Sequence, residues 1–154
     1  MATAALIEHQ EQTLKDEAEI RAVIERLHQA HYDKDVQAIA ASYAQDAAIF
    51  NLAPPLSHQG IDLKEKQAWL DSWDGPIELK PSDLSITISG DLAFCHCYLR
   101  MIGDKKSAPQ RVDFWMRGTL CLSRGAGSWR IVHEHTSVPF YMDGSSRPAF
   151  DLKP

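Results

Sequence analysis

The apolar residues of this chain change their spacing near Gly75, and this change constrains the fold most. Before that point they recur at helical spacing, as in Ile20, Val23 and Leu27. Beyond it they alternate with polar residues, as in a β-strand with one buried face. A helical half followed by an alternating half predicts an α+β fold, with three N-terminal helices packed on one face of an antiparallel sheet.

Capping and breaking residues divide the helical half. Thr13, with an acid three residues later, resembles a capping box, so the first helix is expected to begin there and residues 1–13 to form a frayed tail. Asp35 can cap a short second helix after a charged break. A third helix is expected between Gly60 and Gly75, because a Gly-Pro pair stops a helix.

Five segments are predicted to be strands: 47–52, 84–89, 92–102, 111–123 and 129–138. Short turns follow the segments 84–89 and 111–123, and the alternating half as a whole predicts an antiparallel meander. A chain of 154 residues suits one domain. We expect that domain to span residues 14–140, and residues 141–154 to form an extension that wraps around the body or a partner chain.

The strand expected at 111–123 has two contrasting faces. Its even-numbered residues are apolar apart from a glycine, and an apolar face must be covered by helices or by another subunit. Its odd-numbered residues include an acid, an indole and a guanidinium, and this polar face resembles the wall of a pocket. The odd-numbered residues are Asp113, Trp115, Arg117, Thr119 and Cys121.

If Arg117 and Glu134 share a face, they form a pair across neighbouring strands. Two interpretations stay open. The two residues form a structural ion pair, or Arg117 holds an anionic or carbonyl oxygen while Glu134 acts as a base or a hydrogen-bond acceptor. The expected catalytic residues are therefore Glu134 and Arg117, and the expected ligand-binding residues are Asn51, Trp69, Asp113, Trp115 and Thr119.

His133 and His135 point the same way on the last strand and could chelate a metal ion. A third ligand is missing at any recognisable spacing, so we predict no metal site and expect interface or hydrogen-bonded histidines. The chain also lacks a nucleotide-binding glycine motif, a nucleophile elbow and a zinc signature. The sequence therefore implies no cofactor.

The composition of the chain excludes several classes of binding partner. The formal net charge of −5 argues against nucleic acid, whose phosphates need a basic face. No apolar run approaches the roughly 20 residues of a membrane span, and the N-terminus lacks the basic region of a signal peptide. Of three cysteines, Cys95 and Cys97 are neighbours on one strand face and poorly placed to bridge. Reduced thiols predict a cytoplasmic protein.

These features together resemble the nuclear transport factor 2-like superfamily, a cone of three helices on a curved antiparallel sheet. Within it the chain is similar to SnoaL-like proteins, to bacterial ketosteroid isomerase homologues and to the association domain of calcium/calmodulin-dependent kinase II. The segments that carry the resemblance are SYAQDAAI (42–49), HQGID (58–62), GDLAF (90–94) and WRIVHEHTSVP (129–139). The resemblance implies a conical pocket for a small molecule and dimerisation through the outer sheet face.

Particular functions of the superfamily do not carry over. Ketosteroid isomerase uses a carboxylate base, a tyrosine and a protonated acid. The matching positions here hold Asn51, Leu27 and Gly118, so steroid isomerisation by that mechanism is not expected. The arginines that line the pocket of the kinase association domain are also missing, because the matching positions hold Leu99, Thr119 and Thr136.

Two functions stay open. One is a cofactor-independent enzyme of the isomerase or lyase kind, in which Glu134 moves a proton next to a carbonyl and Arg117 stabilises the oxyanion. The other is a non-catalytic ligand-binding or homo-oligomerisation domain. On the superfamily template both residues point into the cone, while His133 and His135 face the partner subunit of a homodimer or higher homo-oligomer. A β-bulge would swap these assignments.

Overall fold

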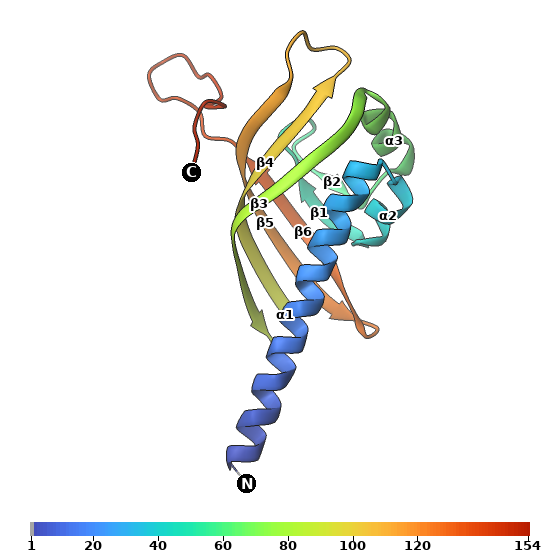
Figure 1. Ribbon diagram of the computed structural model, residues 1–154, viewed down its shortest axis with the longest axis vertical. Coiled ribbons are helices and arrows are strands. Elements are labelled where there is room, and N and C mark those ends of the chain that lie inside the picture. The colour runs from blue at the N-terminus through green and yellow to red at the C-terminus, as the bar shows by residue number, and fades with distance from the viewer. Residues whose placement is uncertain (1) are drawn as a thin grey trace.

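The computed structural model describes the backbone of residues 2–154 and the side chains of residues 4–154. In chain order the elements are α1 (Ala2–Asp33), α2 (Val36–Ala41), β1 (Tyr43–Phe50), β2 (His58–Gln59), α3 (Leu63–Asp71), β3 (Trp73–Ser89), β4 (Leu92–Lys105), β5 (Val112–Gly125) and β6 (Ser128–Ser137). The helices lie against one face of a single curved sheet (Figure 1). The predicted α+β fold is confirmed.

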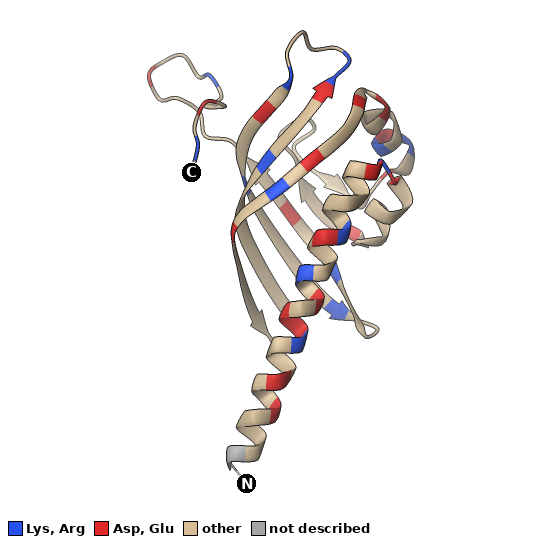
Figure 2. Cartoon of the chain, viewed as in Figure 1, with Lys and Arg blue, Asp and Glu red and all other residues tan. Residues whose placement is uncertain are grey.

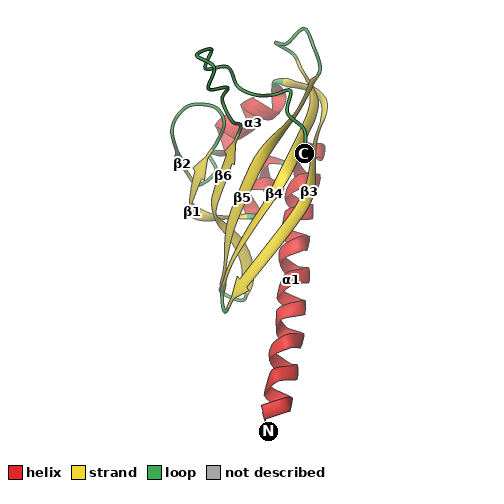
Figure 3. Cartoon of the chain, turned by 90° about the vertical axis from the view of Figure 1, so that its left-hand side faces the viewer, coloured by secondary structure: helices red, strands yellow, loops and turns green. Residues whose placement is uncertain are grey.

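Helix α1 is longer than the capping pattern indicated. It begins at Ala2, so the start predicted at Thr13 is wrong, as is the frayed conformation predicted for residues 2–13; Met1 lies outside the described residues. Residues 4–12 are exposed, and this part of α1 projects beyond the ends of the strands (Figure 3). The Thr13 hydroxyl donates to the carbonyl of His9 at 2.9 Å, which a residue inside a helix can do.

For the second and third helices, the predicted N-terminal ends agree with the structure better than the predicted C-terminal ends do. Asp35 caps α2, accepting a hydrogen bond from the backbone N–H three residues later at 2.9 Å. Asp62 caps α3 in the same way at 2.8 Å. Helix α3 ends at Asp71, before Gly75, and Trp73 already belongs to β3. The helical position predicted for Trp73 is therefore wrong.

The sheet has the strand order β2-β1-β6-β5-β4-β3. Strands β3 to β6 form the predicted antiparallel meander, and β2 pairs antiparallel with β1. Strand β1 pairs with β6 in parallel, so the sheet is not wholly antiparallel. A parallel pair needs a long connection, and the chain supplies one through α3 and the whole meander.

A register shift between β5 and β6 decides which side chains face the helices. Leu122 lies opposite Ile131, but Cys121 lies opposite His133, so Val132 is an extra residue in β6. Because side chains alternate along a strand, one extra residue reverses the faces of all that follow. We call the sheet face against the helices the inner face and the opposite one the outer face.

The core fills the space between the helices and the inner face. Its fully buried members come from helices and strands alike: Ile20, Ile39, Leu70, Ile77, Leu122 and Ile131. At its edge the carboxylate of Asp16, which is 3% exposed, forms an ion pair with Arg124 at the end of β5. Arg124 also contacts Asp91 at 2.9 Å, so this cluster ties α1 to the sheet.

Beyond β6 the chain crosses the end of the sheet as an irregular segment (Figure 3). Within this segment Phe140 forms an isolated bridge with Pro148, and Ala149 is buried. The ring of Phe150 lies 4.6 Å from that of Phe114 on β5, measured between centroids. The C-terminal segment therefore packs on the body of the same chain.

Acidic and basic residues are interspersed along α1 (Figure 2). Among the described residues, no helix combines the length and the low polarity of a segment that crosses a membrane.

Candidate functional site

A cavity of about 530 Å³ lies between the helices and the inner face of the sheet. This volume falls within the usual range of small-molecule sites, about 300–1,000 Å³. Its walls are mainly apolar side chains from α1, β4 and β5, among them Leu27, Leu99, Met101, Phe114 and Met116. The few polar groups that interrupt these walls therefore determine what chemistry the cavity can support.

Glu134 and Tyr43 form the polar centre of the cavity. Tyr43 begins β1 and is 5% exposed, and its hydroxyl donates a hydrogen bond to Oε2 of Glu134. Both residues line the cavity. Burial and the nearby carboxylate raise the pKa of Tyr43 well above its ordinary value, so the phenol stays protonated and keeps donating. The carboxylate is thereby held in one orientation.

Helix α3 contributes an amine to the same cavity. Lys66 lines it, and its Nζ lies 4.3 Å from the centroid of the Trp69 ring. Burial lowers the pKa of Lys66, while the negative charge of Glu134 acts in the opposite direction. Because Asp62 fixes where α3 begins, Lys66 and Trp69 fall one turn apart on the helix face that meets the cavity.

Two histidines of α1 and two thiols of β4 also line the cavity. Burial lowers the pKa of His31 to about 3 and that of His28 to about 4, so both rings are neutral near pH 7. The Nδ1 of His31 donates to the carbonyl of Leu27 at 2.8 Å. Burial raises the pKa of Cys95 to about 12 and also raises the pKa of Cys97, so both thiols stay protonated.

The profile of the SnoaL-like domain matches residues 20–141. The chain belongs to the SnoaL-like family. An NTF2-like protein of unknown function from Pseudomonas putida KT2440 is 34% identical to it, with 92% of this chain and 98% of that chain covered and a TM-score of 0.80. None of the curated proteins compared with the chain matches it.

Two solved structures of lower identity share the fold. A protein of Shewanella frigidimarina NCIMB 400, provisionally described as a ketosteroid isomerase, is 22% identical over 75% of this chain and 92% of its own, with a TM-score of 0.62. A protein of Novosphingobium aromaticivorans DSM 12444, provisionally described as a scytalone dehydratase, is 12% identical over 94% of this chain and 99% of its own, with a TM-score of 0.73.

The SnoaL-like cavity includes four of the seven predicted site residues. Glu134 lies at its centre and Trp69 lies on α3, as described above. Asn51 follows the end of β1 and sits at the exposed rim. Thr119 is part of the lining, although its position on β5 alternates towards the outer face. The structure therefore brings these four residues to one cavity.

The other three predicted site residues lie on the outer face. Arg117 is paired with Ser137 on β6 and its Nε donates to the Ser137 hydroxyl at 3.1 Å. Glu134 is opposite Leu120, so the expected contact between Arg117 and Glu134 is wrong. The reason is the extra residue Val132, because without it the register from the β5–β6 turn would place Arg117 and Glu134 on one face.

Asp113 and Trp115, expected in the pocket wall, contact Arg100 instead. Both guanidinium contacts from Arg100 to the Asp113 carboxylate are 2.8 Å, and the guanidinium lies 6.0 Å from the centre of the Trp115 ring. This pairing of charges explains why a polar sheet face can lie opposite the cavity. The apolar face of β5 lines the cavity because the apolar stripes of the helices must cover it.

His133 and His135 lie on the outer face. The Nδ1 of His133 donates to the carbonyl of Ala48 at 2.8 Å, and both rings meet the Phe50 ring edge-on, at centroid distances of 4.9 and 5.6 Å. Within residues 2–154 no group of three or more His, Cys, Asp or Glu side chains is arranged to hold a metal ion.

Sequence reasoning missed Tyr43, Lys66 and His31 as site residues. In the sequence, Tyr43 and His31 continue the helical spacing of the apolar residues before them, which predicts a place on a helix stripe and gives no sign of a site. Lys66 carried no signal, because a lysine on an amphipathic helix is usually solvated. One feature of the sequence did point to such partners. Glu134 lies between two histidines in a strand that must have an apolar inner face, which indicates a buried carboxylate. A buried carboxylate needs a hydrogen-bond donor from elsewhere in the fold.

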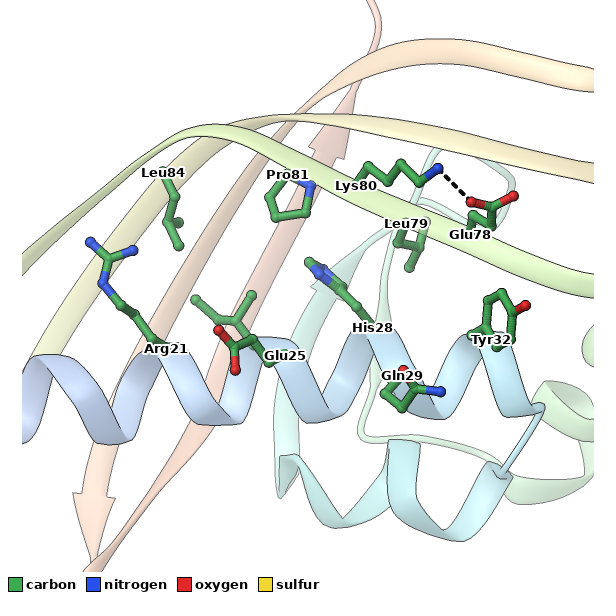
Figure 4. A pocket seen from close by; sticks show the side chains of 11 residues that line it. Arg21, Glu25, His28, Gln29, Tyr32, Glu78, Leu79, Lys80, Pro81 and Leu84 are labelled. Atoms are coloured by element: carbon green, nitrogen blue, oxygen red, sulfur yellow. Dashed lines mark ion pairs between the residues drawn. The ribbon is translucent and has the colours of Figure 1, made fainter.

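A second hollow of about 500 Å³ lies between α1 and β3. In Figure 4 His28 rises from α1 towards Pro81 and Leu79, and an ion pair of 2.5 Å between Lys80 and Glu78 lies along the strand. Four residues line both this hollow and the main cavity: Ile24, His28, Leu79 and Leu84. These side chains form the partition between the cavity and the α1–β3 surface.

Proposed function

We propose that this SnoaL-like protein binds a small carbonyl compound in its cavity and transfers a proton next to the carbonyl, as isomerases and lyases do. The observation that supports this proposal is the carboxylate of Glu134, held by the Tyr43 hydroxyl inside a mainly apolar cavity. Two proteins of the same fold are provisionally described as a ketosteroid isomerase and a dehydratase, and both names denote proton-transfer reactions of this kind.

In this proposed reaction Glu134, Tyr43 and the apolar walls of the cavity have different roles. Glu134 is the base that removes the proton from the carbon beside the carbonyl. Tyr43 is a positioning residue, because its hydrogen bond occupies one carboxylate oxygen and directs the other into the cavity. The apolar walls bind the hydrocarbon part of the substrate. The reaction class follows from a positioned base and an apolar binding surface, whatever the exact substrate.

The test uses 1-tetralone, a bicyclic aromatic ketone with exchangeable protons beside its carbonyl. Proton NMR in D₂O should show that the protein accelerates their replacement by deuterium. Glu134→Gln keeps the shape of the side chain and should slow the exchange by about 100-fold, a typical contribution of a general base. Glu11→Gln, on the exposed part of α1, is the control and should leave the rate unchanged. Wild-type protein that neither binds nor exchanges 1-tetralone would contradict the proposal.

A second role, homodimerisation, is favoured by the outer face. Three aromatic side chains lie exposed there, Phe50 at 39%, Phe94 at 47% and Tyr98 at 44%. Exposed aromatic side chains gathered on one sheet face mark an interaction surface. We propose that a second copy of the chain covers this face. In that arrangement the cavity stays free, because it lies on the opposite side of the sheet.

A further inference from the structure

Proton abstraction beside a carbonyl needs an electrophile that accepts the electron pair. Arg117, the group expected for that part, lies on the outer face. Lys66 is in the cavity, and its amine is close enough to Glu134 for the two charges to influence each other. Its nitrogen also stands over the Trp69 ring, which fixes its direction. The question is whether this amine acts as a charge or as a nucleophile.

Burial has opposite effects on the nucleophiles of this cavity. A thiol must lose a proton and become charged to react, so the burial that raises the pKa of Cys95 to about 12 suppresses its reactivity. An ammonium must lose a proton and become neutral to react, so the burial that lowers the pKa of Lys66 favours its reactive form. The same apolar walls therefore suppress the thiols and shift Lys66 towards its neutral form, against the opposing charge of Glu134.

We propose that Lys66 is a nucleophile that binds an aldehyde or a ketone covalently, as an imine. The inference rests on the proposed function and names its substrate class more closely. A protonated imine withdraws electrons from the neighbouring carbon more strongly than a ketone does, which makes the proton removed by Glu134 more acidic. A covalent imine also supplies the electrophile, which Arg117 cannot provide because it lies on the outer face.

The step is balanced without any redox partner. The neutral amine of Lys66 attacks the carbonyl carbon, a C–N bond forms, and the carbonyl π pair moves to oxygen. Glu134 takes the proton from nitrogen and passes it to that oxygen. Before the attack, the Lys66 ammonium releases one proton to the solvent. That proton then returns to the hydroxyl of the adduct, which leaves as water while the C=N bond forms. The net change is ammonium plus carbonyl to protonated imine plus water.

The test traps the imine on the folded protein with a probe that cannot enolise. Wild-type protein is incubated with 2-naphthaldehyde and sodium cyanoborohydride at pH 7, where exposed lysines are almost fully protonated and react slowly. Mass spectrometry of the intact chain and of its peptides should place one fast addition on Lys66. Lys66→Arg keeps the charge but cannot form an imine, and should lower the fast labelling by at least about tenfold. Lys64→Arg, its exposed neighbour on α3, should label as the wild type does.

Each outcome decides the inference. Labelling of Lys66 no faster than that of Lys64 would overturn it, and so would a Lys66→Arg variant that retains the full rate of 1-tetralone exchange. In both cases an exchange rate that still depends on Glu134 would leave the proposed function intact. The converse result, fast labelling at Lys66 with no exchange activity, would support the imine and contradict only the proton transfer.

Discussion

The hydroxyl of Tyr43 donates a hydrogen bond to the carboxylate of Glu134 across the parallel pairing of β1 and β6. Tyr43 is paired in the sheet with Ile131, while Glu134 is paired with Ile49, and the register between these pairs is irregular. The tyrosine side chain therefore reaches along the sheet to the base. The site depends on a contact between residues 91 positions apart in the chain.

Replacing Tyr43 with Phe should affect both stability and catalysis. It removes a buried donor and leaves the Glu134 carboxylate without its partner, which costs about 1–3 kcal/mol of unfolding free energy. The exchange of 1-tetralone should slow by about tenfold, because the base loses its fixed orientation. Urea unfolding and NMR exchange measure the two effects. Tyr32→Phe, at an exposed tyrosine of α1, should change neither quantity; equal effects at both tyrosines would refute the positioning role.

Gly118→Leu should fill the cavity without disturbing the sheet. A Cβ at Gly118 meets a single neighbour within 4 Å, Sγ of Cys97 at 3.6 Å, so the side chain has room to extend into the cavity. Binding of 1-tetralone, followed by tryptophan fluorescence, should weaken by at least about tenfold while stability is maintained. Gly103 offers the contrast, since a Cβ there lies 2.9 Å from the Trp73 ring and Gly103→Ala should destabilise the fold. Unchanged affinity in Gly118→Leu would place the ligand elsewhere.

Stability should fall in acid because of His31. Its pKa is lowered from the ordinary 6.5 to about 3, so the unfolded chain binds a proton between these values that the folded protein does not. The contribution of His31 is fully present above pH 6.5 and is lost as the pH falls towards 3. The unfolding free energy should change through His31 by at most about 1.4 kcal/mol per pH unit. Urea unfolding from pH 7 to pH 4 should therefore be less steeply pH-dependent in His31→Gln than in wild-type protein.

His9 on the exposed part of α1 provides the control for this prediction, and His9→Gln should retain the wild-type pH dependence. His28 adds a smaller effect of the same sign, between pH 6.5 and about 4. An identical pH profile for wild type and His31→Gln would mean that the ring is not held neutral in the folded protein.

Replacing His133 and His135 together with Ala should weaken self-association. Both rings pack edge-on against Phe50 on the outer face, so their loss removes part of the aromatic surface that we assign to the second copy. Sedimentation velocity over a range of concentrations should show a shift towards monomer, with 1-tetralone binding preserved. A wild-type protein that is monomeric at all concentrations would contradict the dimer.

The sequence by itself determined the fold class, the starts of the second and third helices and the four-strand meander, because these follow from local periodicity and capping. Asp35, for example, caps its helix wherever the rest of the chain lies. The sequence also indicated Glu134 as a candidate base. The true length of α1 was missed because Thr13 satisfies a capping pattern inside a sequence that continues to favour helix.

Tertiary structure alone decided which groups meet Glu134. A single extra residue, Val132, reverses the faces of the β6 residues that follow it, which turns Glu134 to the inner face while Arg117 on β5 lies on the outer face. The parallel pairing of β1 with β6 brings Tyr43 to the base, and the packing of α3 brings Lys66. Register and helix docking depend on the sum of many distant contacts, so no local pattern of residues can specify them.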